Sequence, residues 1–197
     1  MEKIFFRVDS SNEIGSGHIY RCINLAKSLK NKYKIFFICR KFDGNLIHKI
    51  RSEKFKVLIN NKKINYSHPK VWSKNKQKED VEFIKKKLKK KYKFIISDHY
   101  GLGKTWGKRI KDIFERHLAI DDSKYFNKVC DFYLNYNFSE KSLNSKNKKT
   151  KYFCGQKFIL NGHNILFKKK TNKKSYKRIF IFFGSVDKKN FTKFFYN

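Results

Sequence analysis

The stretch "KIFFRVDSSNEIGSGHIYRCINLAKSL", residues 3–29, decides how this chain folds. Its first seven residues form a nearly continuous apolar run that ends in Asp9, which is typical of a parallel strand buried on both faces. Apolar residues at helical spacing then fill residues 18–30. The stretch therefore predicts a strand, a glycine-containing turn and a helix. Glycines in such a turn let backbone amides approach a ligand closely.

The same alternation continues along the chain. Further strands are predicted at 34–40, 56–60, 93–101 (ending in a polar loop), 118–122 and 130–137. Helices are predicted at 44–53, 78–91 and 109–117, and a polar loop at 138–151. Strands that alternate with helices indicate βαβ units, and their right-handed crossovers give a doubly wound parallel sheet. The expected fold class is α/β with a Rossmann-like parallel sheet.

The pattern of strand, glycine turn and helix restarts near the end of the 197-residue chain, in "RIFIFFGSVDKKN". We therefore predict an N-terminal Rossmann-like domain at 1–167, a linker at 168–178 and, at 179–197, the start of a second, nucleotide-binding domain. Because only a strand, a turn and one helix follow the linker, this second domain is expected to be truncated. The apolar strand at 179–183 would then be exposed and prone to pairing.

The chain is strongly basic, with 49 Lys and Arg against 16 Asp and Glu and a formal net charge of +33. Only seven of the basic residues are Arg, although phosphate-binding surfaces usually use the bidentate guanidinium as well as Lys. The charge has two interpretations: drift towards residues with A/T-rich codons, or a surface for polyanions. The lysines of 78–91 fit a solvated helix face, and nucleic-acid binding without catalysis is the alternative.

The cysteines, the apolar runs and the histidines indicate which cellular compartment and which cofactors to expect. Four widely spaced cysteines without a CxxC pair fit reduced intracellular thiols: Cys22, Cys39, Cys130 and Cys154. The start of the chain does not read as a signal peptide, and no apolar run approaches the ~20 residues of a membrane span. A cytoplasmic protein is predicted. Histidines outside the glycine turn lack partners at metal-ligand spacing, so we expect neither a metal nor a cofactor.

Polar residues follow the predicted strands at their carboxyl ends, where open parallel sheets bind ligands. These residues should converge on one crevice: Asp9, Ser10, the 15–18 turn, Asp98, His99, Tyr100, Asp121 and Asp122. His18, in the first helical turn, would be kept neutral by the helix dipole, which is the form that a general base needs. The structural alternatives are that Asp98 and Asp121 cap turns, that Tyr100 is a packing aromatic and that His18 only bonds a neighbouring loop.

Several motifs occur together in one order along nearly the whole chain: "FRVDSSNEIGSGHIYRCINLAKSL", "ISDHYG", "IDD", "DFYLNYN", "YFCGQKFIL" and "FFGSVDKKN". As a set they resemble the UDP-2,4-diacetamido-2,4,6-trideoxy-β-L-altropyranose hydrolase family of pseudaminic acid biosynthesis. The resemblance implies a GT-B-type fold and a metal-independent reaction. In that reaction water attacks the anomeric carbon of a UDP-sugar, UDP leaves and the free amino sugar is released.

The resemblance also implies roles for individual residues. His18 would be the general base, Tyr100 would position water or the sugar, and Asn190 would contact substrate. The remaining expected substrate-binding residues are Asp9, Gly15, Gly17, Arg21, Asp98, His99 and Asp122. One departure is that the second glycine turn, usually GGxD in this family, has a serine in place of its second glycine. The alternative within this fold is a GT-B glycosyltransferase subunit that needs a partner chain to supply the nucleotide-binding domain.

Overall fold

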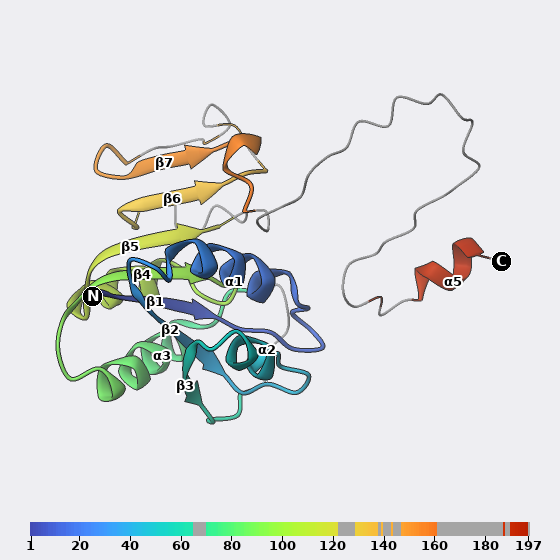
Figure 1. The fold of residues 1–197 in the computed structure, drawn as a ribbon, viewed down its shortest axis with the longest axis horizontal. Helices are drawn as coiled ribbons and strands as arrows, with labels where there is room; N and C mark the ends of the chain where they lie inside the picture. The colour runs from blue at the N-terminus through green and yellow to red at the C-terminus, as the bar shows by residue number, and fades with distance from the viewer. Residues whose placement is uncertain are drawn as a thin grey trace.

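One parallel sheet organises the part of the chain that the computed structural model describes, namely residues 1–64, 70–121, 129–137, 139, 143, 147–160, 187 and 190–196 (Figure 1). The strand order is β3-β2-β1-β4-β5-β6-β7, and every neighbouring pair is parallel. The strands are β1 (Lys3–Val8), β2 (Lys34–Arg40), β3 (Lys56–Asn60), β4 (Tyr92–Asp98), β5 (Phe114–Ile120), β6 (Phe132–Asn135) and β7 (Lys151–Cys154). The helices are α1 (Gly17–Leu29), α2 (Ile47–Ser52), α3 (Lys74–Lys87), α4 (Lys104–Arg109), η1 (Ile110–Asp112), η3 (Gln156–Phe158) and α5 (Phe191–Tyr196). The predicted α/β, Rossmann-like class is confirmed.

Strand β1 is buried on both faces, as its apolar run predicts. Ile4, Phe6 and Val8 pack in the same core cluster as the inward residues of α1 and α2. Phe5 belongs to the second cluster, which includes the inward residues of α3 and α4. Successive side chains of a strand point to opposite faces, so one apolar run serves two helical layers.

The strand order reverses between β1 and β4. From β1 the chain runs outward through α1, β2, α2 and β3, whereas β4 lies on the other side of β1 and leads to β5, β6 and β7. A crevice forms at such a reversal, beyond the carboxyl ends of the strands. The segments that follow β1 and β4, around Asp9 and Asp98, therefore lie at the place where this topology binds ligands.

The helix predicted at 109–117 is wrong. In the structure α4 ends at Arg109 and η1 covers Ile110–Asp112. Strand β5 then begins at Phe114 and pairs with β4 from Tyr92 onwards. Ile110, Ile113 and Phe114 are spaced like a helical stripe, which explains the error. Pairing with β4 overrides this local period, because the strand buries Phe114 and His117 within the sheet.

Helix α3 and strand β7 also differ from the prediction. Helix α3 begins four residues earlier than the predicted 78, where Ser73 caps it by accepting from the Lys76 N–H at 3.4 Å, and it ends at Lys87. Strand β7 was not predicted, and its first residue lies in the stretch expected to be a loop. Short polar flanks on both sides hid it, although its Tyr152 pairs with Tyr133 of β6 in register.

The predicted linker at 168–178 and the strand at 179–183 lie outside the described residues. Helix α5 stands where the pattern predicts a helix after the second glycine turn. The domain boundaries stay predictions. Among the helices that the structure describes, none has the length and apolar character needed to cross a bilayer.

Candidate active site at the carboxyl ends of β1 and β4

Asp98, the last residue of β4, is the centre of the first cluster. Its Oδ1 lies 2.5 Å from Nδ1 of His18, and Arg21 donates from Nε and Nη2 to its two carboxylate oxygens. Burial alone would raise the pKa of Asp98, but its interactions with His18 and Arg21 outweigh burial and hold that pKa well below its usual range. Asp98 is therefore a buried anion that orients two side chains of α1.

The ring of His18 is held from two sides. Its Nδ1–H donates to Asp98, so Nε2 is the nitrogen left for chemistry on a ligand. The ring of Tyr100 meets it edge to face, with centroids 4.8 Å apart and an interplanar angle of 87°. Nη2 of Arg21 lies 2.9 Å from Nδ1, as expected for two donors that share one carboxylate oxygen. The strand-end rule predicted His18, Asp98 and Tyr100 for one crevice and the resemblance implied Arg21 as a substrate-binding residue, and the structure brings the four together.

Tyr136 joins this cluster and was missed in the sequence. Nη1 of Arg21 donates to the Tyr136 hydroxyl at 2.5 Å, and the guanidinium carbon lies 5.7 Å from the centre of the tyrosine ring. Tyr136 directly follows β6, whose carboxyl end lies at the same edge of the sheet as that of β4. The rule that polar residues follow parallel strands would have found it if applied to this strand.

Asp9 lies in a second, fully buried network. It accepts from Arg7 at 2.6 and 3.0 Å, from Nε2 of His99 at 2.8 Å and from the backbone N–H of Arg40 at 2.6 Å. Burial opposes its ionisation, but Arg7 and His99 lower its pKa well below the usual value. This geometry favours a structural role for Asp9 and His99. That either residue binds substrate stays a prediction.

Asp80 of α3 closes the second network and was also missed. It accepts from Nε and Nη2 of Arg7 at 3.0 and 2.8 Å and from the indole N–H of Trp106 at 3.0 Å. The lysine-rich surroundings of Asp80 read as a solvated helix face. The spacing of Asp80 would have indicated that it is buried, because Gln77, Asp80 and Ile84 fall on one helical stripe and all three are buried.

The glycine turn between β1 and α1 is open towards the ligand side. Gly15 has φ of 79°, and its N–H donates to the Ser11 carbonyl at 2.8 Å. Gly17, the first residue of α1, does not have positive φ, and a Cβ built on it would meet no atom within 4 Å. No side chain caps the start of α1, and no acidic residue lies in its first turn. The space beside Gly17, at the positive dipole end of α1, is thus not filled by a neighbouring side chain.

The other predicted residues are placed as follows. Ser10 accepts from the backbone N–H of Leu46 at 2.8 Å and so ties the end of β1 to the start of α2. Asp121 is buried after β5. Asp122 lies outside the described residues. Asn190 precedes α5 with φ of 52°, and its contact with substrate stays a prediction. In the described parts of the chain, no three His, Cys, Asp or Glu side chains are grouped as metal ligands are.

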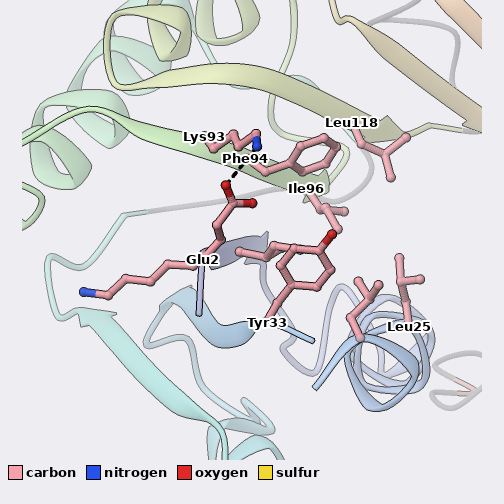
Figure 2. Close-up of a pocket in the computed structure, with 10 residues that line it drawn as sticks. Glu2, Leu25, Tyr33, Lys93, Phe94, Ile96 and Leu118 are labelled. Atoms are coloured by element: carbon pink, nitrogen blue, oxygen red, sulfur yellow. Dashed lines mark hydrogen bonds and ion pairs between the residues drawn. The ribbon is translucent and has the colours of Figure 1, made fainter. Parts of the chain in front are cut away.

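A pocket of about 430 Å³ lies elsewhere, against the amino ends of the strands (Figure 2). Its walls are the starts of β1 and β4 and the second half of α1, and Figure 2 shows the Glu2–Lys93 ion pair, 2.8 Å long, at its side. None of the predicted site residues lines it. Because open parallel sheets bind ligands at the carboxyl ends of their strands, we assign the candidate site to the crevice around Asp98.

His117 gives the fold a measurable sensitivity to acid. It is buried with Nε2 2.7 Å from the Ser97 hydroxyl, and burial lowers its pKa from 6.5 to about 3. Below about pH 6.5 the unfolded chain takes up a proton that the folded chain refuses, so stability falls by up to about 1.4 kcal/mol per pH unit. In urea denaturation between about pH 7 and 5, we expect the free energy of unfolding of His117→Gln to decrease less with falling pH than that of the wild type. Replacement of the exposed His48 by Gln should leave the pH dependence unchanged. An unchanged slope in His117→Gln would contradict the assignment.

The fold and this crevice define a class: a Rossmann-like α/β protein with an Asp–His pair at the switch point of its sheet. No family model matches the chain. It is 29% identical over 192 residues to the UDP-2,4-diacetamido-2,4,6-trideoxy-β-L-altropyranose hydrolase of Campylobacter jejuni, an alignment covering 95% of this chain and 62% of that protein. It is 28% identical over 202 residues to an uncharacterised protein of Methanocaldococcus jannaschii, covering 96% of this chain and 38% of that protein. The resemblance inferred from the sequence is confirmed, and the chain spans less than two thirds of each relative.

Proposed function

We propose that this chain hydrolyses a UDP-linked 2,4-diacetamido-2,4,6-trideoxy hexose to the free sugar and UDP, as a step of pseudaminic acid biosynthesis. The observation that carries the proposal is the pair of His18 and buried Asp98 at the switch point, 2.5 Å apart. The similarity to a UDP-sugar hydrolase supports this substrate class. None of the four cysteines forms a disulfide in the described residues, which supports the cytoplasm as the proposed compartment.

In the proposed reaction Nε2 of His18 takes a proton from a water molecule. The water oxygen bonds to the anomeric carbon, and the bond from that carbon to the UDP oxygen breaks, so UDP leaves with the electron pair. The ionised Asp98 stabilises the imidazolium that forms, and His18 then returns its proton to solvent. Because UDP is a good leaving group, activation of water matters more than a strong general acid.

The turn before α1 would receive the substrate. The positive end of the helix dipole and the first-turn amides suit an anionic or hydroxyl-rich ligand. In the part of the chain that the structure describes, neither backbone conformation nor packing requires glycine at position 17, because its φ is not positive and a Cβ there would meet no atom within 4 Å. We infer that the ligand needs this space.

Two alanine variants separate a ligand requirement from a backbone requirement, with UDP release followed by phosphorus NMR. Gly17→Ala should leave the free energy of unfolding equal or slightly higher and raise KM by about tenfold or more, because its Cβ enters the ligand space. Gly15→Ala should cost about 1 kcal/mol or more of stability, because alanine is strained at φ of 79°. Unchanged KM in Gly17→Ala would refute the placement of the substrate. No UDP release by the wild-type chain would refute the hydrolase proposal itself.

A further inference from the structure

His99 stands between two residues of the candidate site and points away from both. Asp98 before it holds His18, and Tyr100 after it packs on His18. The His99 ring instead lies in the buried layer on the other face, edge to face with Trp72 at 4.7 Å between centroids. Asp98 is the last residue of β4 and His99 the first residue after it, and their side chains turn to different partners, His18 and Trp72.

We propose that His99 is a positioning residue: braced by Asp9 and bonded to the backbone N–H of Gly101, its neutral ring fixes the 99–101 turn and so holds Tyr100 against His18. The two bonds that define this role are both 2.8 Å long, from Nε2 to Asp9 Oδ2 and from the Gly101 nitrogen to Nδ1. The catalytic consequence rests on the proposed role of His18 as general base.

The hydrogen bonds determine the tautomer of His99. The Gly101 N–H can donate only to an unprotonated Nδ1, so the ring proton is on Nε2, which donates to Asp9. In a doubly protonated ring, the Nδ1–H of His99 would face the backbone N–H of Gly101, and two donors cannot form a hydrogen bond with each other. Burial is the main cause that lowers the pKa of His99, and it acts in the direction that this geometry requires.

The brace behind His99 is continuous and buried. Asp9, which receives the His99 proton, is held by Arg7, and Arg7 is held in turn by Asp80 of α3. The turn itself fits closely on the ring, since a Cβ on Gly101 would lie 2.6 Å from Cε1 of His99. The Gly101 carbonyl accepts from the Trp72 N–H at 2.8 Å, which fixes the other side of that residue. A small change at His99 is therefore transmitted to Tyr100.

Two amide variants each remove one of the two ring hydrogen bonds of His99, to Asp9 or to Gly101, and keep the other. The side-chain amide of Asn reaches the place of Nδ1, so His99→Asn keeps an acceptor for Gly101 and loses the bond to Asp9. The longer Gln reaches the place of Nε2, so His99→Gln keeps a donor to Asp9 and loses the acceptor for Gly101. The readouts are the nuclear Overhauser effect between the Tyr100 and His18 rings, the melting temperature, and kcat and KM for UDP release.

We expect His99→Asn to keep the Tyr100–His18 Overhauser effect and to retain kcat within about threefold. His99→Gln should lose that effect and lower kcat by about tenfold or more with KM within about twofold, at a melting temperature similar to that of His99→Asn. If both variants keep the effect and kcat, or if both lose them in proportion to the melting temperature, the positioning role is refuted.

A measurement on the wild-type chain keeps the inference testable if either variant fails to fold. The Gly101 nitrogen and Nδ1 of His99 should show a scalar coupling across their hydrogen bond, and the His99 nitrogen shifts should report a proton on Nε2 alone. Absence of the coupling, or a proton on Nδ1, overturns the proposal. Neither this coupling nor the Overhauser effect needs catalysis, so a chain that shows both but releases no UDP refutes the proposed function and leaves the positioning of Tyr100 standing.

Discussion

Replacing His18 by alanine is expected to lower kcat for UDP release by about 10²–10⁴-fold with little change in KM, because a general base acts in the transition state. Nδ1 of His18 is bonded to Asp98, so the variant removes the one ring nitrogen that can reach water. His48→Ala is the matched control, because His48 is an exposed histidine in α2. Its kcat and KM should equal those of the wild type.

A His18→Ala chain that releases UDP as fast as the wild type would refute the assignment of the base. The same variant also distinguishes the other functions that the sequence allows. A basic nucleic-acid-binding domain would bind polyanions with an affinity that weakens steeply with salt and that survives His18→Ala. A glycosyltransferase subunit would show activity only after addition of a separate chain that supplies a nucleotide-binding domain.

The parts of the fold that could be predicted are those whose signal is local. Strands β2 and β3 have the predicted bounds, because apolar runs bounded by polar residues can be recognised without knowledge of the neighbouring strand. The convergence of His18 and Asp98 follows from chain order alone, since polar residues after parallel strands share one edge. The first half of β5 was mistaken for a helix, although its second half falls in the strand predicted at 118–122, because pairing with β4, and not its own period, decides its conformation.

The parts of the site that could not be predicted depend on distant pairing. Arg7 and Asp80 are 73 positions apart, and no local pattern joins a strand arginine to an aspartate in a lysine-rich helix. The expectation that Asp9 and His99 face the ligand assumed that every polar residue at a strand end turns the same way. His99 is the first residue after β4, and its ring packs on Trp72, whereas Asp98 bonds to His18; only this packing shows which side each side chain takes.

Asp80→Asn is expected to lower the free energy of unfolding by about 3–5 kcal/mol, because it leaves a buried charge without its partner. Arg7 would keep one carboxylate, Asp9, in place of two, and the nearby guanidinium of Arg40, whose Nη2 lies 3.4 Å from Asp80, would lose its ion pair with Asp80. The side chains of Arg7, Arg40 and Asp80 are each at most 2% exposed, so water cannot compensate for the loss. Urea denaturation at about pH 7, far from carboxylate titration, measures the difference.

Glu79→Gln is the matched control, because it makes the same change from carboxylate to amide one residue earlier in the same helix. The ion pair between Glu79 and Lys62 is 2.7 Å long but solvent-exposed, with side chains 46% and 62% exposed. Exposed pairs contribute little, so its loss should not measurably change the urea midpoint. Equal effects of the two variants would contradict the network. A large loss confined to Asp80 would show that α3 is held to β1 by buried charge, the same charge that fixes Asp9 behind the ring of His99.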